Sequence, residues 1–164
     1  MLYVGMVLVG LLLGAPAGAA GQSYVGTLQA VIDGDTIHLL RETGQIVRLE
    51  LYGIDAPELG QPHGPAAARA VRRLLFDNRI RAVGSGTDED GRPLFVVTVD
   101  DRAVNEELVR LGHAWWDRRR APRDNRLRRL EAEARANGRG LWARADPVPP
   151  WVWRGGEEGR EIPL

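Results

Sequence analysis

The feature that most constrains the fold is a run of three β-rich segments joined by very short links. "YVGTLQAVI" (24–32) is followed after "DGD" by "TIHLL" (36–40), and "QIVRLELYG" (45–53) follows after "RETG". Asp-Gly between two such segments is a strong hairpin signal, and links this short permit only antiparallel pairing. The sequence therefore predicts an antiparallel meander and excludes a parallel sheet with helical crossovers.

The rest of the chain adds two strands and three helices. Strand-like composition covers 79–86 and 93–101, and helical spacing of apolar residues or helix start and stop signals cover 66–76, 103–112 and 124–138. Asp124 is the expected N-cap of the last helix. Together these elements predict an α+β fold, a five-stranded Greek-key β-barrel of OB type with three α-helices.

The first twenty residues have the composition of a signal peptide. They carry no charged side chain, are apolar from Leu2 to Leu13, and then present Ala17 and Ala19 in the spacing that signal peptidase accepts. We expect a signal peptide at 1–20 and an exported protein, periplasmic or extracellular, with no stable membrane association after cleavage. An uncleaved N-terminal anchor is the alternative, because no Lys or Arg precedes the apolar run.

Residues 21–164 are expected to form a single domain. Its core spans 24–144, and the Pro- and Gly-rich segment 145–164 is expected to be an irregular tail on the surface. The chain contains no cysteine, which excludes disulfides, thiolate catalysis and cysteine-based zinc sites. A bound metal would therefore need ligands other than sulfur, and oxygen ligands suit calcium.

Arginine and tryptophan are the residues most suited to nucleic-acid contact. The arginine-rich run 117–129 is the best candidate for steering a nucleic acid, and a solvated helix face with internal ion pairs is its alternative. Trp151 and Trp153 are expected to dock the tail onto its own domain, with stacking on bases as the alternative. His38, His63 and His113 show no zinc-site spacing and are expected to be structural.

Five motifs stand in an order and spacing that resembles the staphylococcal nuclease (thermonuclease) family. They are "VIDGDT", "GIDAPE", "DEDGR", "VNEELVRLGHAWW" and "EAEARANGRGLWA", and the resemblance extends from Tyr24 to Trp153. Each motif alone is weakly specific, but the five in order are strongly specific. The resemblance implies an OB-type barrel that binds one calcium ion and hydrolyses phosphodiester bonds in DNA or RNA.

The resemblance also implies roles for individual residues. Asp35 and Asp55 would be calcium ligands, with the backbone carbonyl of Ala56 as a third, and calcium is a hard cation that prefers such oxygen ligands. Glu58 would be the general base, and Arg92 would contact the phosphate. The alternatives are that Asp35 shapes a turn, that Glu58 caps the next segment and that Arg92 is a solvated loop charge.

The chain departs from the family pattern at two positions. Members of the family have an arginine five residues before the aspartate of the "GIDAPE" corner, and Glu50 stands there instead. Arg48 faces the same side of the strand, about 6.6 Å away, and is the expected replacement for the missing cation. An ion pair between Arg48 and Glu50 is the alternative. In addition, Asp90 precedes the "GR" motif where the family commonly has tyrosine, which adds negative charge near the phosphate.

These observations support two hypotheses of function. The first is an exported, calcium-dependent nuclease, expected to be monomeric, that acts on DNA, RNA or both. The second is a catalytically weakened or inactive domain of the same fold that binds nucleic acid or another anionic ligand.

Overall fold

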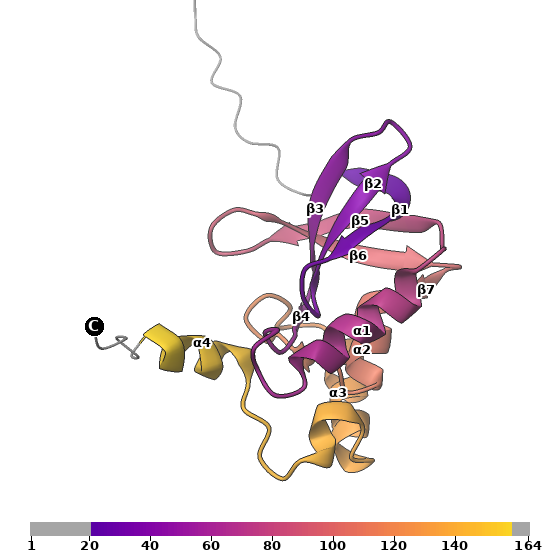
Figure 1. Cartoon of the computed structure of the whole chain (residues 1–164). Helices are drawn as coiled ribbons and strands as arrows, with labels where there is room; N and C mark the ends of the chain where they lie inside the picture. The colour runs from indigo at the N-terminus through magenta and orange to yellow at the C-terminus, as the bar shows by residue number, and fades with distance from the viewer. Residues whose placement is uncertain (1–20, 159–164) are drawn as a thin grey trace, which may run out of the picture.

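The structure, a computed structural model that describes residues 21–158, begins with the predicted antiparallel meander (Figure 1). The predicted signal peptide lies outside these residues. β1 (Ser23–Val31) pairs with β2 (Thr36–Arg41), which pairs with β3 (Ile46–Leu51). In the turn between β1 and β2, Asp33 Oδ1 accepts hydrogen bonds from the N–H groups of Asp35 and Thr36, at 3.0 and 2.7 Å.

Two further strands close the meander into a barrel. β5 (Ile80–Thr87) pairs with β1, and β6 (Pro93–Val99) pairs with β5, in both cases antiparallel. β6 then meets β3 in a short parallel ladder at Glu50↔Leu94 and Leu51↔Phe95. The result is the predicted α+β fold with a closed five-stranded barrel of OB type.

Alternating side chains fill the barrel. Leu49 and Leu51 are completely buried, whereas Arg48 is exposed and Glu50 partly buried on the opposite face of β3. The expectation that positions 48 and 50 share a face is confirmed, as a strand period of two requires.

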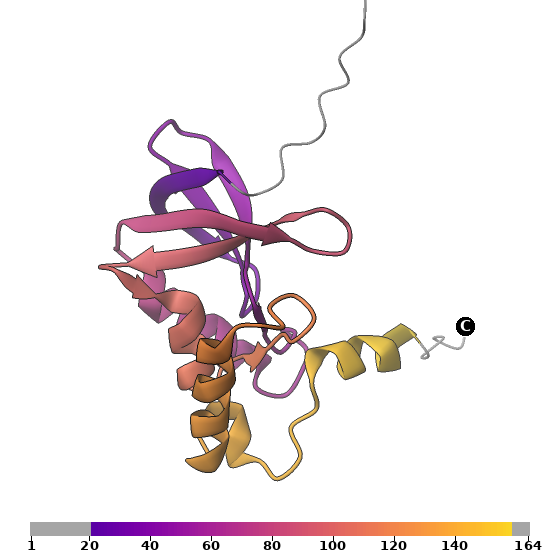
Figure 2. The same ribbon diagram turned by 180° about the vertical axis from the view of Figure 1, so that it is seen from behind.

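The three predicted helices lie at one end of the barrel (Figures 1 and 2). They are α1 (Gly64–Leu75), α2 (Val104–Arg110) and α3 (Asn125–Ala136). Asp124 caps α3 as predicted, because its carboxylate accepts hydrogen bonds from the N–H groups of Arg126 and Leu127 at 3.0 and 2.9 Å. None of the helices within residues 21–158 is long and apolar enough to cross a membrane.

A buried amide joins the barrel to the helices. Asn105, at the start of α2, is 3% exposed. Its Oδ1 accepts from the Val97 N–H at 2.9 Å, and its Nδ2 donates to the carbonyls of Tyr52 and Phe95 at 2.9 and 3.0 Å. This one side chain thereby satisfies backbone groups of β6 and of the segment that leads to the "GIDAPE" corner.

Two features were absent from the sequence-based expectation. Short strands β4 (Ile54–Asp55) and β8 (Trp115–Trp116) form a separate antiparallel ladder, and β7 (Arg102–Ala103) pairs antiparallel with the end of β6. A 3-10 helix covers Gly140–Ala143, and a fourth helix, α4, covers Pro150–Glu158.

The prediction of an irregular tail is wrong for α4. The Pro149 carbonyl accepts hydrogen bonds from the N–H groups of Val152 and Trp153 at 3.1 and 3.0 Å, so the first turn closes despite two adjacent prolines. Proline is favourable at a helix start, where its missing N–H has no intrahelical role. The Pro and Gly content of the tail thus concealed a helix that begins at a proline.

Candidate active site

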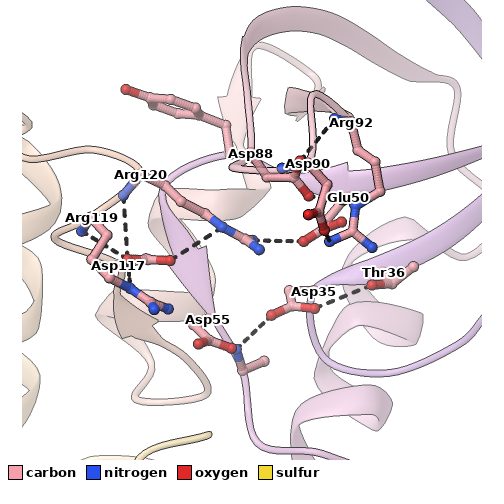
Figure 3. Close-up of polar contacts among 12 residues, drawn as sticks. Asp35, Thr36, Glu50, Asp55, Asp88, Asp90, Arg92, Asp117, Arg119 and Arg120 are labelled. Atoms are coloured by element: carbon pink, nitrogen blue, oxygen red, sulfur yellow. Dashed lines mark hydrogen bonds and ion pairs between the residues drawn. The ribbon is translucent and has the colours of Figure 1, made fainter. Parts of the chain in front are cut away.

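The "DGDT" turn and the "GIDAPE" corner meet at one edge of the barrel (Figure 3). Asp35 Oδ2 accepts a hydrogen bond from the Ala56 N–H at 2.7 Å, across 21 residues of sequence. Gly34 permits this approach, since a Cβ there would lie 2.6 Å from the Cβ of Ala56. The backbone of the turn therefore places the Asp35 carboxylate directly against the corner.

Asp55 is held in place by the β4–β8 ladder. It pairs with Trp115, and its side chain is only 5% exposed. Burial raises the pKa of Asp55 above its ordinary value, although the guanidinium of Arg154 acts in the opposite direction. A buried carboxylate of this kind needs a cation beside it to stay ionised.

Asp35 shows the same need for a cation. Its pKa is raised well above the ordinary value, first by burial and then by the negative charges of Asp33 and Asp55. Asp35 and Asp55 are thus two acids whose pKa values are both raised. At an edge of the fold that offers oxygen atoms and no sulfur, they suit a hard divalent cation such as calcium.

The residues present fit a site completed by groups from outside the chain. Among the described residues, no cluster of three or more His, Cys, Asp or Glu side chains is arranged to hold a metal ion. Calcium takes six to eight oxygen ligands, so Asp35 and Asp55 would supply the charge, and waters and substrate oxygens the remainder. Ala56 is buried and contacts Asp35 through its N–H; the ligand role of its carbonyl stays a prediction.

Glu58 lies at the mouth of the same edge. Its side chain is 34% exposed, so both water and substrate can reach it. Its backbone N–H donates to Gln61 Oε1 at 3.2 Å, and a Cβ on Gly64 would collide with the Glu58 carbonyl. The loop between the corner and α1 is thus tightly folded, which holds the backbone of Glu58 in place.

Arg92 is oriented by the acids that surround it. Its Nε donates to Asp88 at 2.5 Å, and its Nη2 lies 3.0 Å from Asp90. The Asp88 side chain is 2% exposed, whereas that of Arg92 is 60% exposed. Asp90, which the sequence suggested as a source of repulsion, therefore helps to hold the arginine that would bind the phosphate.

Glu50 forms an ion pair that the sequence did not suggest. Arg120 Nη1 lies 2.6 Å from Glu50 Oε1, and the two side chains are 20% and 16% exposed (Figure 3). The expected alternative, a pair between Glu50 and Arg48, is not found among residues 21–158, where Arg48 has no ion pair or side-chain hydrogen bond. The role of Arg48 toward a phosphate stays a prediction.

A third arginine, Arg154 of α4, lies against the two most important acids of the site. Its Nη2 donates to Asp55 Oδ2 at 2.7 Å, and its Nη1 donates to Asp55 Oδ1 at 3.2 Å and to Glu58 Oε1 at 2.6 Å. The hydrogen bonds that Arg154 donates to Asp55, the largest cause, and to Glu58 raise the pKa of Arg154 above its ordinary value.

Sequence reasoning missed Arg120 and Arg154. Nothing local distinguishes Arg120 within the arginine-rich run, and Arg154 lies in a tail that was expected to be irregular. One signal was available: an acid at position 50, next to other acids, requires a compensating cation from elsewhere in the chain.

The remaining candidates have mainly structural contacts. His63 Nε2 lies 3.0 Å from His113 Nδ1, and burial, the largest cause, lowers the pKa of His113 to about 4. Trp151 packs edge-on against Trp115 with ring centroids 6.3 Å apart, which confirms that the tail docks onto its own domain.

The arginine-rich run is divided between inward and outward side chains. Arg118 lies over the Trp116 ring, Arg120 reaches Glu50, and Arg126 forms an ion pair with Glu106 at 2.9 Å. Other arginines of the run are exposed, namely Arg123, Arg128 and Arg129. Part of the run is therefore committed to the fold, and part remains available for an anionic partner.

Comparison with known proteins agrees with this arrangement. Residues 48–144 match the family model described as "Staphylococcal nuclease homologue". An "Uncharacterized endonuclease" of Escherichia coli is 38% identical over 130 residues, which cover 79% of this chain and 84% of the relative.

Two other relatives extend over more of the chain. "Protein ParB" of Escherichia coli is 36% identical and covers 94% of this chain and 90% of its own length. A "Micrococcal nuclease" of Shigella flexneri is 33% identical, with 88% of this chain and 86% of the relative covered. From the barrel, the order of its motifs and these matches, we conclude that the chain belongs to the staphylococcal nuclease family.

Proposed function

We propose that this protein is an exported, calcium-dependent nuclease that hydrolyses phosphodiester bonds of DNA, RNA or both. The observation that carries the proposal is the convergence of Asp35, Asp55 and Glu58 at one edge of the barrel, with Arg92 held nearby by acids. The names of the relatives and the family match support the reaction class. The apolar N-terminal segment supports export.

Each residue has a distinct part in the proposed reaction. Glu58 accepts a proton from the attacking water, while Arg92 donates N–H bonds to phosphate oxygens and offsets the charge that accumulates in the transition state. Asp35, Asp55 and the Ala56 carbonyl would hold the calcium ion, which supplies Lewis-acid polarisation of the phosphate when bound. Outward-facing arginines such as Arg123 attract the polyanion by charge.

Chelation is expected to abolish cleavage. The protein beginning at Gln22 is incubated with single-stranded DNA or RNA in calcium or in excess chelator, and products are resolved on a gel. Calcium is also expected to raise the thermal unfolding midpoint, because it binds only the folded state. Cleavage that continues undiminished in chelator would contradict the metal dependence.

The alternative function, binding without turnover, draws on the acid at position 50 and on the contact between Arg154 and the site. It predicts salt-sensitive binding of single-stranded nucleic acid with no products under any metal. The same cleavage assay decides between the two functions.

A further inference from the structure

The Glu50–Arg120 pair joins two elements that the catalytic edge needs. Glu50 lies on β3, and Arg120 lies in the loop after β8, 70 residues later in the chain. The pair is mostly shielded from solvent, with both side chains at or below 20% exposure. A shielded ion pair with a 2.6 Å contact holds its guanidinium in one place, which a solvated arginine does not achieve.

A second acid fixes the loop that carries Arg120. Asp117 is 2% exposed, and its Oδ1 accepts from the N–H groups of Arg119 and Arg120 at 2.9 and 3.3 Å. Its Oδ2 lies 3.4 Å from Arg120 Nε, and its own N–H donates to the Gly53 carbonyl at 2.9 Å. The loop is therefore anchored to the residue that precedes β4, and hence to Asp55.

Arg120 and Arg92 approach Glu50 from two sides, and each guanidinium is gripped by carboxylates (Figure 3). The hydrogen bond to Asp88 is the main cause that raises the pKa of Arg92, and the charge of Glu50 adds to it. Burial lowers the pKa of Arg120, and the charge of Glu50 acts against burial, so that this pKa is raised. A guanidinium has five N–H donors, and within the described residues Nη2 of Arg120 makes no hydrogen bond. Donors of Arg120 therefore remain for an anion.

We propose that Arg120 supplies the second phosphate-binding guanidinium of the site and that Glu50 is its positioning residue. In the family an arginine on the strand supplies this cation, whereas here Arg120 of the loop after β8 supplies it. The acid at position 50 therefore supports the site by holding Arg120. This inference rests on the proposed nuclease function. It also reverses an expectation: Glu50→Arg would place two guanidinium groups together and expel Arg120.

The test compares kcat and KM on single-stranded DNA in calcium for Arg120→Ala, Arg120→Lys and Glu50→Arg. A single positioned arginine accelerates phosphoryl transfer by about 10³- to 10⁵-fold. Because Arg120 would act together with Arg92, its removal is expected to lower kcat/KM by about 10²-fold or more. Arg120→Lys is expected to retain only part of the activity, because lysine lacks the planar guanidinium group. Arg79→Ala, an exposed arginine whose partner Glu42 lies in the link between β2 and β3, is the control and stays within about threefold.

A charge exchange tests whether an ion pair between positions 50 and 120 is needed. Glu50→Arg alone is expected to lower kcat/KM, and Glu50→Arg combined with Arg120→Glu is expected to recover a large part of the loss. Equal activity of Arg120→Ala and Arg79→Ala overturns the proposal, as does a gain of activity in Glu50→Arg. If the unaltered protein never cleaves, the nuclease function fails, and affinity for single-stranded DNA then decides: Arg120→Ala must bind more weakly than Arg79→Ala.

A separate observation concerns Arg154. Its guanidinium binds both oxygens of Asp55 and one of Glu58, although α4 is 96 to 99 residues away in sequence. Two contacts hold α4 in this position. Gln61 Nε2 donates to the Val148 carbonyl at 2.5 Å, and Trp151 packs on Trp115. α4 projects from the molecule beside the corner that carries Asp55 (Figures 1 and 2).

We infer that Arg154 is a built-in competitor of the metal. Calcium binds carboxylate oxygens at about 2.3–2.6 Å, so a guanidinium on both oxygens of Asp55 and a calcium ion on the same oxygens exclude one another. Binding of the ion then requires Arg154 to leave, and α4 acts as an autoinhibitory contact. The inference rests on the proposed calcium site and deepens it.

Calorimetric titration of calcium into the unaltered protein, Arg154→Ala and Arg144→Ala tests this directly, without any measurement of activity. Arg144 is the control, an exposed arginine that precedes α4. A partly exposed ion pair is worth about 1 kcal/mol, and each 1.4 kcal/mol is tenfold, so Arg154→Ala is expected to bind calcium about three- to tenfold more tightly. Equal affinity in all three proteins overturns the inference alone, and no binding by any of them removes the calcium site as well.

Discussion

Replacement of Glu58 by glutamine is expected to reduce cleavage by about 10² to 10⁴, the range that a general base contributes. The amide has nearly the same shape as the carboxylate but cannot take a proton from water. Because the side chain is 34% exposed and its side-chain contact is with Arg154, the fold should tolerate the change. Turnover of single-stranded DNA in calcium and the thermal midpoint measure the two effects separately.

Glu42→Gln is the matched control for this experiment. Glu42 is also an exposed acid paired with one arginine, Arg79, at 2.9 Å, but it lies in the link between β2 and β3. Its replacement should leave activity within about twofold, as expected for a surface ion pair. If Glu58→Gln retains more than about a tenth of the activity, another group activates the water and the assignment of Glu58 is wrong.

Replacement of Asn105 by alanine is expected to lower the free energy of unfolding by about 3 to 5 kcal/mol. The change leaves the Val97 N–H and the Tyr52 and Phe95 carbonyls without the partner that the side chain supplied. Each buried polar group left unsatisfied costs about 1–3 kcal/mol. The Phe95 carbonyl also accepts from the Tyr52 N–H at 2.8 Å, so its own loss falls at the low end of this range.

Urea denaturation followed by circular dichroism measures this effect. Asn125→Ala is the control, since Asn125 is exposed at the first position of α3, and its change should stay below about 0.5 kcal/mol. A loss below about 1 kcal/mol in Asn105→Ala would show that water replaces the amide. Tyr52 leads into the "GIDAPE" corner, so looser packing there should also weaken calcium binding.

Predictions of local structure were confirmed where the interactions that stabilise an element lie within a few residues of sequence. The "DGD" link specified the hairpin between β1 and β2 because Asp33 bonds backbone groups two and three residues away. Asp124 specified the start of α3 for the same reason. The tail was mispredicted because its Pro and Gly content suggested irregular backbone, whereas α4 begins at Pro150, a position where proline is favourable.

The sequence alone determined the antiparallel barrel, the helix at Asp124 and the acids that the resemblance places in the site, since turn chemistry, periodicity and motif spacing act over a few residues. Only the tertiary structure decided which cation meets which acid. Arg48 is two positions from Glu50 in the sequence, yet Glu50 pairs with Arg120. Asp55 pairs with Arg154, which is 99 residues away in the sequence. Ion pairs form between charges that are close in space. Those distances are set by closure of the barrel, by the β4–β8 ladder and by the docking of α4.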